Sequence, residues 1–192
     1  MNSRVKEILF PTLALLIICL VTTALLGFTD NLTRDTIERV NEEIAQKSRE
    51  QVCPDAASFE KMELESGAGV YKALDGSGNL IGFAISTASS GYGGDIKVMT
   101  GIDSQSGTVI SINVYDNSNE TPGLGANTST EKFMSQYSGV SVTQGFIVNK
   151  NGYTEPKYPI DAVTGATISS TAVTNAVNEA LDIYNNYCGE EG

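Results

Sequence analysis

The sequence contains no histidine, and this absence removes several kinds of active site at once. It excludes a haem or zinc site with histidine ligands, and a catalytic unit that pairs serine or cysteine with histidine. Only three cysteines occur, far apart in the chain, which is too few for an iron–sulfur site with four thiolate ligands. Redox chemistry in this chain would therefore need an organic cofactor.

Basic residues are also scarce, because 12 Lys and Arg stand against 23 Asp and Glu, for a formal net charge of −11. An acidic chain of this kind is repelled by phosphates, so we expect no nucleic-acid partner. The dinucleotide-binding pattern Gly-x-Gly-x-x-Gly after a strand is missing too, which argues against a nicotinamide site. We expect neither catalytic nor metal-binding residues, and the chain is not expected to be a catalyst alone.

Residues 8–28 form an apolar run without any charge. As a helix this run would span roughly 31 Å, about the thickness of one hydrocarbon core. The alternative is a cleaved signal peptide, whose apolar core is usually shorter, about 7–15 residues. Because the sequence at the end of the run is also a poor cleavage site, we predict a retained transmembrane anchor over residues 1–29.

The charges beside the run predict its orientation. Arg4 and Lys6 precede it and Asp30 follows it. The positive-inside rule therefore predicts a single pass through the cell (inner) membrane, with the N-terminus in the cytoplasm and the rest of the chain on the extracytoplasmic side. Since residues 1–29 carry one net positive charge, the remaining chain has a net charge of −12. Anionic lipid headgroups would repel that part of the chain.

Residues 30–52 are polar and rich in helix formers, which predicts a linker helix within the linker region 30–60. The Cys53-Pro54 pair would end the helix, because the residue before a proline is pushed out of the helical region. Outside the cytoplasm, Cys53 and Cys188 would be in an oxidising compartment where disulfides form. Whether these two cysteines pair depends on their separation, which the sequence leaves open.

Residues 61–192 predict an α+β domain of antiparallel strands with packed helices. Alternating apolar residues and turn clusters indicate two hairpins, then a short helix, another strand and a long final helix. The expected ranges are 69–74 with 80–87, 96–103 with 108–115, 129–137, 145–148 and 167–187.

The segment Asp161-Ala-Val-Thr-Gly-Ala-Thr167 directly precedes the final predicted helix. Either Thr164 or Thr167 is placed to act as the N-cap. Helix N-termini attract phosphate through unpaired N–H groups, and the small Gly165 and Ala166 would let a phosphate ester approach the backbone. By itself, the segment is equally consistent with a plain turn and cap.

Two glycine-rich loops follow predicted strands: Gly-Tyr-Gly-Gly at 91–94 and Glu-Thr-Pro-Gly-Leu-Gly at 120–125. Glycine lets the backbone approach a flat ligand closely, although each loop alone would also suit an ordinary turn.

The two loops and the Thr-Gly-Ala-Thr segment, in this order behind a single N-terminal span, resemble the FMN-binding domains of two respiratory complexes. These are the Rnf complex and the sodium-translocating NADH:quinone reductase. In that family a flavin transferase moves FMN from FAD onto the last threonine of the motif and forms a phosphodiester. The resemblance covers nearly the whole chain and implies that Thr167 carries a covalent FMN.

The same resemblance implies where the rest of the cofactor binds and which residue guides its attachment. Asp161 is implied as a residue that the transferase needs. The further FMN-binding positions implied are Thr164, Gly165 and Ala166 at the phosphate, and Glu120, Thr121, Leu124, Gly125 and Tyr92 along the ring.

The resemblance to the Rnf form is better, because the quinone-reductase counterpart is usually a longer chain. It implies the G subunit of such a complex, which relays electrons through its FMN within an ion-translocating ferredoxin:NAD oxidoreductase. The partners implied are the membrane and iron–sulfur subunits, and the flavin transferase during maturation. Two alternatives stay open: the equivalent subunit of the quinone reductase, and a membrane-tethered binding module without a cofactor.

Overall fold

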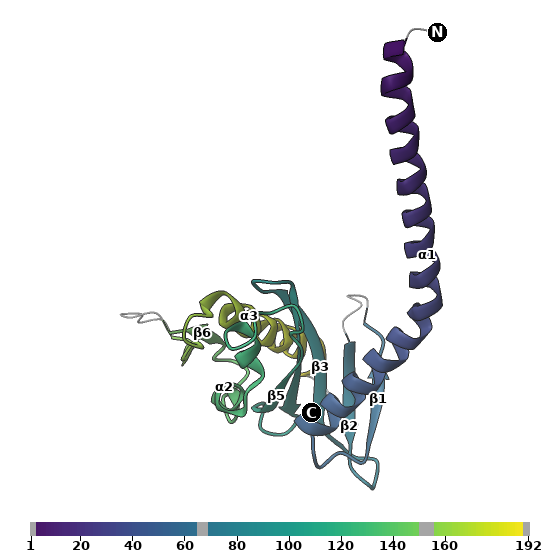
Figure 1. Cartoon of the computed structure of the whole chain (residues 1–192). Helices are drawn as coiled ribbons and strands as arrows, with labels where there is room; N and C mark the ends of the chain where they lie inside the picture. Colours follow the sequence, from purple (N-terminus) through teal and green to yellow (C-terminus); the bar gives the residue numbers. More distant parts are fainter. Residues whose placement is uncertain (1–2, 65–68, 150–155, 190–192) are drawn as a thin grey trace. The chain divides into compact units, whose positions relative to one another are not determined.

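The computed structural model describes residues 3–64, 69–149 and 156–189, with side chains from residue 8 onward (Figure 1). Its contacts divide the chain into two compact units, Met1–Glu43 and Ile44–Gly192. Each unit is described here by itself.

A single helix, α1 (Ser3–Val52), contains both the predicted anchor and the predicted linker helix. Within the described residues it is the one helix long and apolar enough to cross a membrane, and the side chains of residues 8–28 are all exposed. The hydroxyls of Thr12 and Thr22 donate to the carbonyls of Ile8 and Ile18 at 2.8 and 2.9 Å. Such internal pairing suits an apolar environment, which offers no water as a partner.

Five antiparallel strands form a meander in the order β1-β2-β3-β4-β5. Both predicted hairpins are confirmed by the pairs β2–β3 and β4–β5. The bounds are β1 Ser58–Met62, β2 Gly69–Leu74, β3 Leu80–Ser90, β4 Asp95–Asp103 and β5 Val109–Asp116.

The predicted end of the linker helix before Cys53-Pro54 is confirmed, because α1 stops at Val52. β1 begins at Ser58, inside the linker region 30–60, and was not predicted. β1 was missed because its sequence Ser-Phe-Glu-Lys-Met is mostly exposed and shows no apolar alternation.

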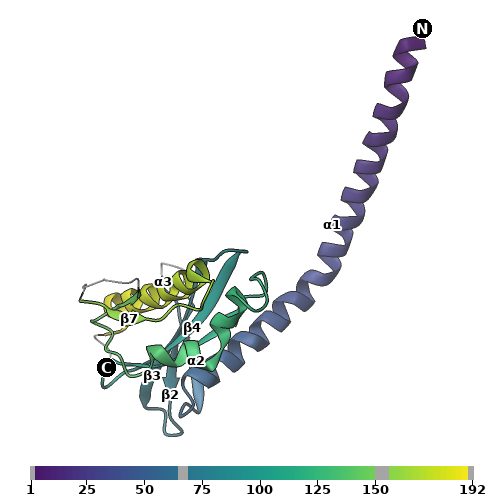
Figure 2. The same ribbon diagram turned by 60° about the vertical axis from the view of Figure 1, so that its left-hand side comes forward.

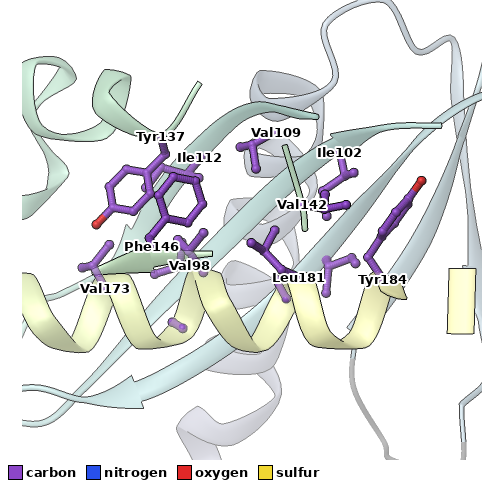
Figure 3. Close-up of a cluster of buried hydrophobic side chains, with 14 of the residues drawn as sticks. Val98, Ile102, Val109, Ile112, Tyr137, Val142, Phe146, Val173, Leu181 and Tyr184 are labelled. Atoms are coloured by element: carbon purple, nitrogen blue, oxygen red, sulfur yellow. The ribbon is translucent and has the colours of Figure 1, made fainter. Parts of the chain in front are cut away.

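One face of the sheet carries the main core (Figure 3), which is covered by α3 (Thr167–Ile183) and its π-helical extension η3 (Tyr184–Cys188). Phe83 packs edge-on against Tyr184, with ring centroids 5.7 Å apart. α3 contacts both β3 and β4, and Figure 2 shows it along the sheet. The final helix predicted over 167–187 is therefore confirmed.

The opposite face of the sheet is covered by the last turns of α1. Val52 is fully buried there beside Ala84 and Met99. Gly101 has no room for a side chain, because an added Cβ would overlap the Val52 carbonyl. The end of α1 is thus an integral part of the second unit.

Cys53 and Cys188 lie in the separate core clusters on these two faces and form no disulfide. The pairing that the sequence left open is therefore absent. Burial, with a smaller contribution from the charge of Asp103, raises the pKa of the Cys53 thiol to about 12.

Short elements complete the second unit. The predicted helix over 129–137 consists of three pieces, with Phe133 and Tyr137 buried in the core and Met134 half-buried. A parallel pair, which includes a strand that was not predicted, stands apart from the meander. These elements are η1 Gly125–Ser129, α2 Glu131–Met134, η2 Ser135–Tyr137, β6 Phe146–Val148 and β7 Tyr158–Ile160.

Candidate functional site

A tight turn leads from the Thr-Gly-Ala-Thr segment into α3. The N–H of Ala166 donates to the carbonyl of Val163 at 2.9 Å, and Gly165 takes a φ of 77° at the third position of the turn. A positive φ at this position is typical of a type II turn and favours glycine. Gly165 is therefore required by the turn itself.

The expectation that Thr164 or Thr167 caps α3 is wrong. The N-cap is Ala166, which makes no side-chain capping bond, and Thr167 is the first residue of the helix. The start of the helix is instead tied to the turn by Ser170, whose hydroxyl accepts the N–H of Val163 at 3.0 Å. Because Thr167 does not cap, its exposed hydroxyl makes no hydrogen bond to any other residue that the structure describes.

The first turn of α3 provides donors for an anion. The N–H groups of Thr167, Ile168 and Ser169 come before the first N–H that donates within the helix, that of Ser170 to the Ala166 carbonyl. The positive end of the helix dipole lies beside them. A phosphate beside the Thr167 hydroxyl would meet these groups, as phosphates do at other helix N-termini.

The loop over residues 120–125 contains a second turn of the same design. The N–H of Leu124 donates to the carbonyl of Thr121 at 3.1 Å, with Pro122 second and Gly123 third at a φ of 79°. The two turns touch, since a Cβ added at Gly165 would lie 3.1 Å from Cδ2 of Leu124.

The loop over residues 91–94 closes the β3–β4 hairpin and packs beside the second loop. The N–H of Gly91 donates to the carbonyl of Gly94 at 2.8 Å. A Cβ at Gly93 would overlap the carbonyl oxygen of Asn119, so the contact between the two loops is backbone on backbone.

Glu120 connects both loops to α3. Its Oε1 accepts the N–H groups of Tyr92 and Gly93 at 2.8 and 3.0 Å, and its Oε2 accepts the Ser169 hydroxyl at 2.6 Å. The residue is only 5% exposed. Burial alone would raise the pKa of Glu120, but the hydrogen bonds from Ser169, Gly93 and Tyr92 outweigh it and lower the pKa below its ordinary value. The carboxylate is therefore ionised at neutral pH.

These three segments enclose a pocket of about 550 Å³. This volume is within the range usual for small-molecule sites, about 300–1,000 Å³. The pocket is lined by Tyr92, Glu120, Thr121, Leu124, Gly125, Gly165, Ala166, Thr167, Ile168 and Ser169.

The structure thus brings together eight of the nine residues expected to bind the cofactor; Thr164 is exposed in the turn and is not part of the lining. Ser169 was missed, because only its distance to Glu120 reveals a role. Asp161 lies outside the pocket: its backbone N–H donates to Gln136 at 2.8 Å and its carboxylate accepts from Asn149 at 3.3 Å.

The rim of the pocket is apolar. Tyr92, Leu124 and Ile168 are 72%, 43% and 57% exposed, which is unusual for large apolar side chains beside a cavity. They would cover a flat aromatic ring, while the α3 amides would hold an anionic group. Among the residues that the structure describes, no cluster of three or more acidic or cysteine side chains could hold a metal ion.

The pocket lies within a region of the chain that matches a known domain. Residues 91–182 match the family model of the FMN-binding domain, and residues 1–52 match that of the RnfG N-terminal region. A solved structure of the C subunit of Na(+)-translocating NADH-quinone reductase from Parabacteroides distasonis superposes with a TM-score of 0.57. It covers 74% of this chain and 91% of that one at 19% identity, and so confirms the α+β fold.

Two curated relatives align over nearly the full length. The G subunit of the Na(+)-translocating ferredoxin:NAD(+) oxidoreductase complex of Acetobacterium woodii is 34% identical, covering 91% of this chain and 90% of the relative. The G subunit of the ion-translocating oxidoreductase complex of Methanosarcina acetivorans is 32% identical, covering 94% and 96%. The chain, which carries an FMN-binding domain over residues 91–182, therefore belongs to the family of G subunits of Rnf-type ion-translocating oxidoreductase complexes.

Proposed function

We propose that this chain relays electrons within an Rnf-type complex through an FMN bound covalently to Thr167 by a phosphodiester. The observation that carries the proposal is the position of the Thr167 hydroxyl. It is exposed, lines the pocket, and stands on the first turn of α3 beside N–H groups without helical acceptors. When bound, FMN supplies the ability to accept and release electrons singly or in pairs.

The residues of the pocket would divide the work of binding. The amides at the start of α3 hold the phosphate, and the apolar rim of Tyr92, Leu124 and Ile168 covers the ring. A diester phosphate carries one negative charge, less than a free phosphate monoester, which carries about 1.5 to 2 at neutral pH. The smaller charge is favourable beside the ionised Glu120.

The proposed partners are other subunits of the complex, and the proposed location is the cell membrane. Because the relatives are named as subunits of ferredoxin:NAD(+) or ion-translocating oxidoreductases, the partners are the other subunits of such a complex, including its membrane and iron–sulfur subunits. A flavin transferase attaches the FMN outside the cytoplasm. The chain crosses the cell membrane once through α1, with its N-terminus in the cytoplasm.

Of the two alternatives, a quinone-reductase component is disfavoured by the relatives that align over nearly the full length, which are Rnf-type G subunits. A binding module without cofactor is distinguished by colour, since a flavoprotein is yellow.

The intact mass of the full chain tests the proposed attachment. Protein made together with its transferase should weigh more by one FMN less one water, and should fluoresce after denaturing electrophoresis. Protein made without the transferase should have the mass of the polypeptide alone. Yellow protein that loses all flavin on denaturation would refute the covalent link.

Labelling in whole cells tests the orientation. Ser77, exposed in the β2–β3 turn, is replaced by Cys in a chain in which Cys19 is Ala. The buried Cys53 has a raised pKa and should not react. A membrane-impermeant maleimide should label intact cells as fully as lysed ones. Labelling that appears only after lysis would reverse the topology.

A further inference from the structure

We infer that Glu120 is the positioning residue of the pocket: its carboxylate joins the two glycine-rich loops to α3, and its oxygens are the nearest obstacle to a side chain at Gly91 and at Gly125. The resemblance implied a different role, contact with the flavin ring. The inference rests on the proposed FMN site, but its first test needs no flavin.

The contacts of Glu120 reach far along the chain. Its two oxygens accept three hydrogen bonds, from Tyr92 and Gly93 on one loop and from Ser169 on α3. An ionised carboxylate that accepts several bonds binds its donors more strongly than a neutral acceptor would. Removing it would leave all three donors without their partner and release both the 91–94 loop and the first turn of α3 from the 120–125 loop.

The two glycines lie against the carboxylate oxygens. A Cβ added at Gly91 would overlap Oε1 of Glu120 first, with Ile96 and the Gly94 carbonyl next nearest. One added at Gly125 would overlap Oε2 of Glu120 and, less closely, the Ser169 hydroxyl that Oε2 binds. The φ of neither glycine is in the left-handed region, so their backbone conformation alone would admit alanine. The space beside these two glycines is therefore filled by protein atoms, with the Glu120 carboxylate nearest, and is not reserved for the ligand.

The Glu120 carboxylate therefore fixes both the first turn of α3, which carries Thr167, and the loop that carries Tyr92 of the rim. Ser169 is two residues after Thr167, and Tyr92 lines the same pocket from the 91–94 loop. Because Glu120 holds both, its loss would change the distance between the attachment point and the apolar rim.

Hydrogen–deuterium exchange on the full chain, made without the transferase, tests the clamp directly. In Glu120→Ala the amides of Tyr92 and Gly93 should exchange about tenfold faster or more, as expected for the loss of a hydrogen bond to a charged group. Glu120→Gln keeps one oxygen acceptor of the same reach and should show a smaller increase. Tyr137→Phe, which loses only a buried bond to Thr174, serves as the control and should leave these two amides unchanged.

Unchanged exchange of Tyr92 and Gly93 in both Glu120 variants would overturn the inference. This outcome is independent of FMN, so it can be told apart from a failure of the proposed function. If the wild-type chain carries no flavin but the exchange result holds, the clamp stands and the FMN assignment falls.

A double-mutant cycle then tests the glycine argument through covalent loading. Gly125→Ala should lower the fraction of flavinylated chain about tenfold in the wild-type background, because the new methyl meets Oε2. Combined with Glu120→Ala it should add little further loss, at most about twofold, because the Ser169 hydroxyl, which also lies near the new methyl, no longer has Oε2 as its partner and can turn away. Glu120→Asp, whose shorter side chain withdraws the oxygens, provides a second background if Glu120→Ala does not fold.

Gly76→Ala is the matched control, since nothing lies within 4 Å of an added Cβ there and its φ is not positive. It should leave loading unchanged in every background. An equal loss from Gly125→Ala with and without the Glu120 side chain would refute the inference, because the glycine would then be needed to leave room for another group, such as the Ser169 hydroxyl.

Discussion

Thr167→Ala, made together with the transferase, is expected to lack the covalent flavin completely while the domain stays folded. The Thr167 hydroxyl makes no hydrogen bond to any described residue, and the side chain is exposed, so its removal costs little stability. Its chemical role has no substitute, because alanine has no oxygen to form the ester bond. Intact mass should show the loss of one FMN less one water.

Three variants control this result. Thr171→Ala removes a hydroxyl one turn further along α3, where it donates to the Thr167 carbonyl at 2.7 Å and does not line the pocket. Thr164→Ala removes the other threonine of the motif, which is exposed in the turn. Both should keep the full mass increment, and Thr167→Ser should keep part of it. A full increment in Thr167→Ala would show that another residue is the acceptor.

Two truncated chains should differ strongly in stability. A chain of residues 44–192 retains the last turns of α1, whereas one of residues 61–192, the domain expected from the sequence, lacks Val52, Cys53 and the start of β1. Both Val52 and Cys53 are buried against the far face of the sheet. Burial of one such apolar side chain contributes about 1.5–3 kcal/mol.

The shorter chain should therefore lose roughly 5 kcal/mol or more once the exposed sheet face is included, which is comparable with the lower end of the total stability of a small domain. Urea unfolding followed by circular dichroism should give a cooperative transition for 44–192. For 61–192 we expect a much lower midpoint or aggregation. Equal midpoints would show that α1 merely rests on the sheet and that the domain begins later than we propose.

Structural features that depend on residues close together in the sequence could be predicted. The charge-free run of α1, the two hairpins with their turn clusters and the apolar stripe of α3 each depend on the order of residues within one short segment. Hydrophobic periodicity and turn chemistry report such order directly. The features that were not predicted have weak local patterns. They are the exposed edge strand β1, and β7, whose three residues are too few to show periodicity.

The sequence by itself determined which segments form the site, because the two glycine loops and the Thr-Gly-Ala-Thr turn are local motifs. Only the tertiary structure decided how they work together. Glu120 meets Tyr92 and Ser169 across 28 and 49 positions of the chain, and Cys53 and Cys188 are separated by the whole sheet. Such relations depend on which strands pair and which face a helix covers. No local sequence pattern encodes contacts between residues so far apart in the chain. From the sequence, Glu120 was therefore expected only to line the pocket, like its neighbours.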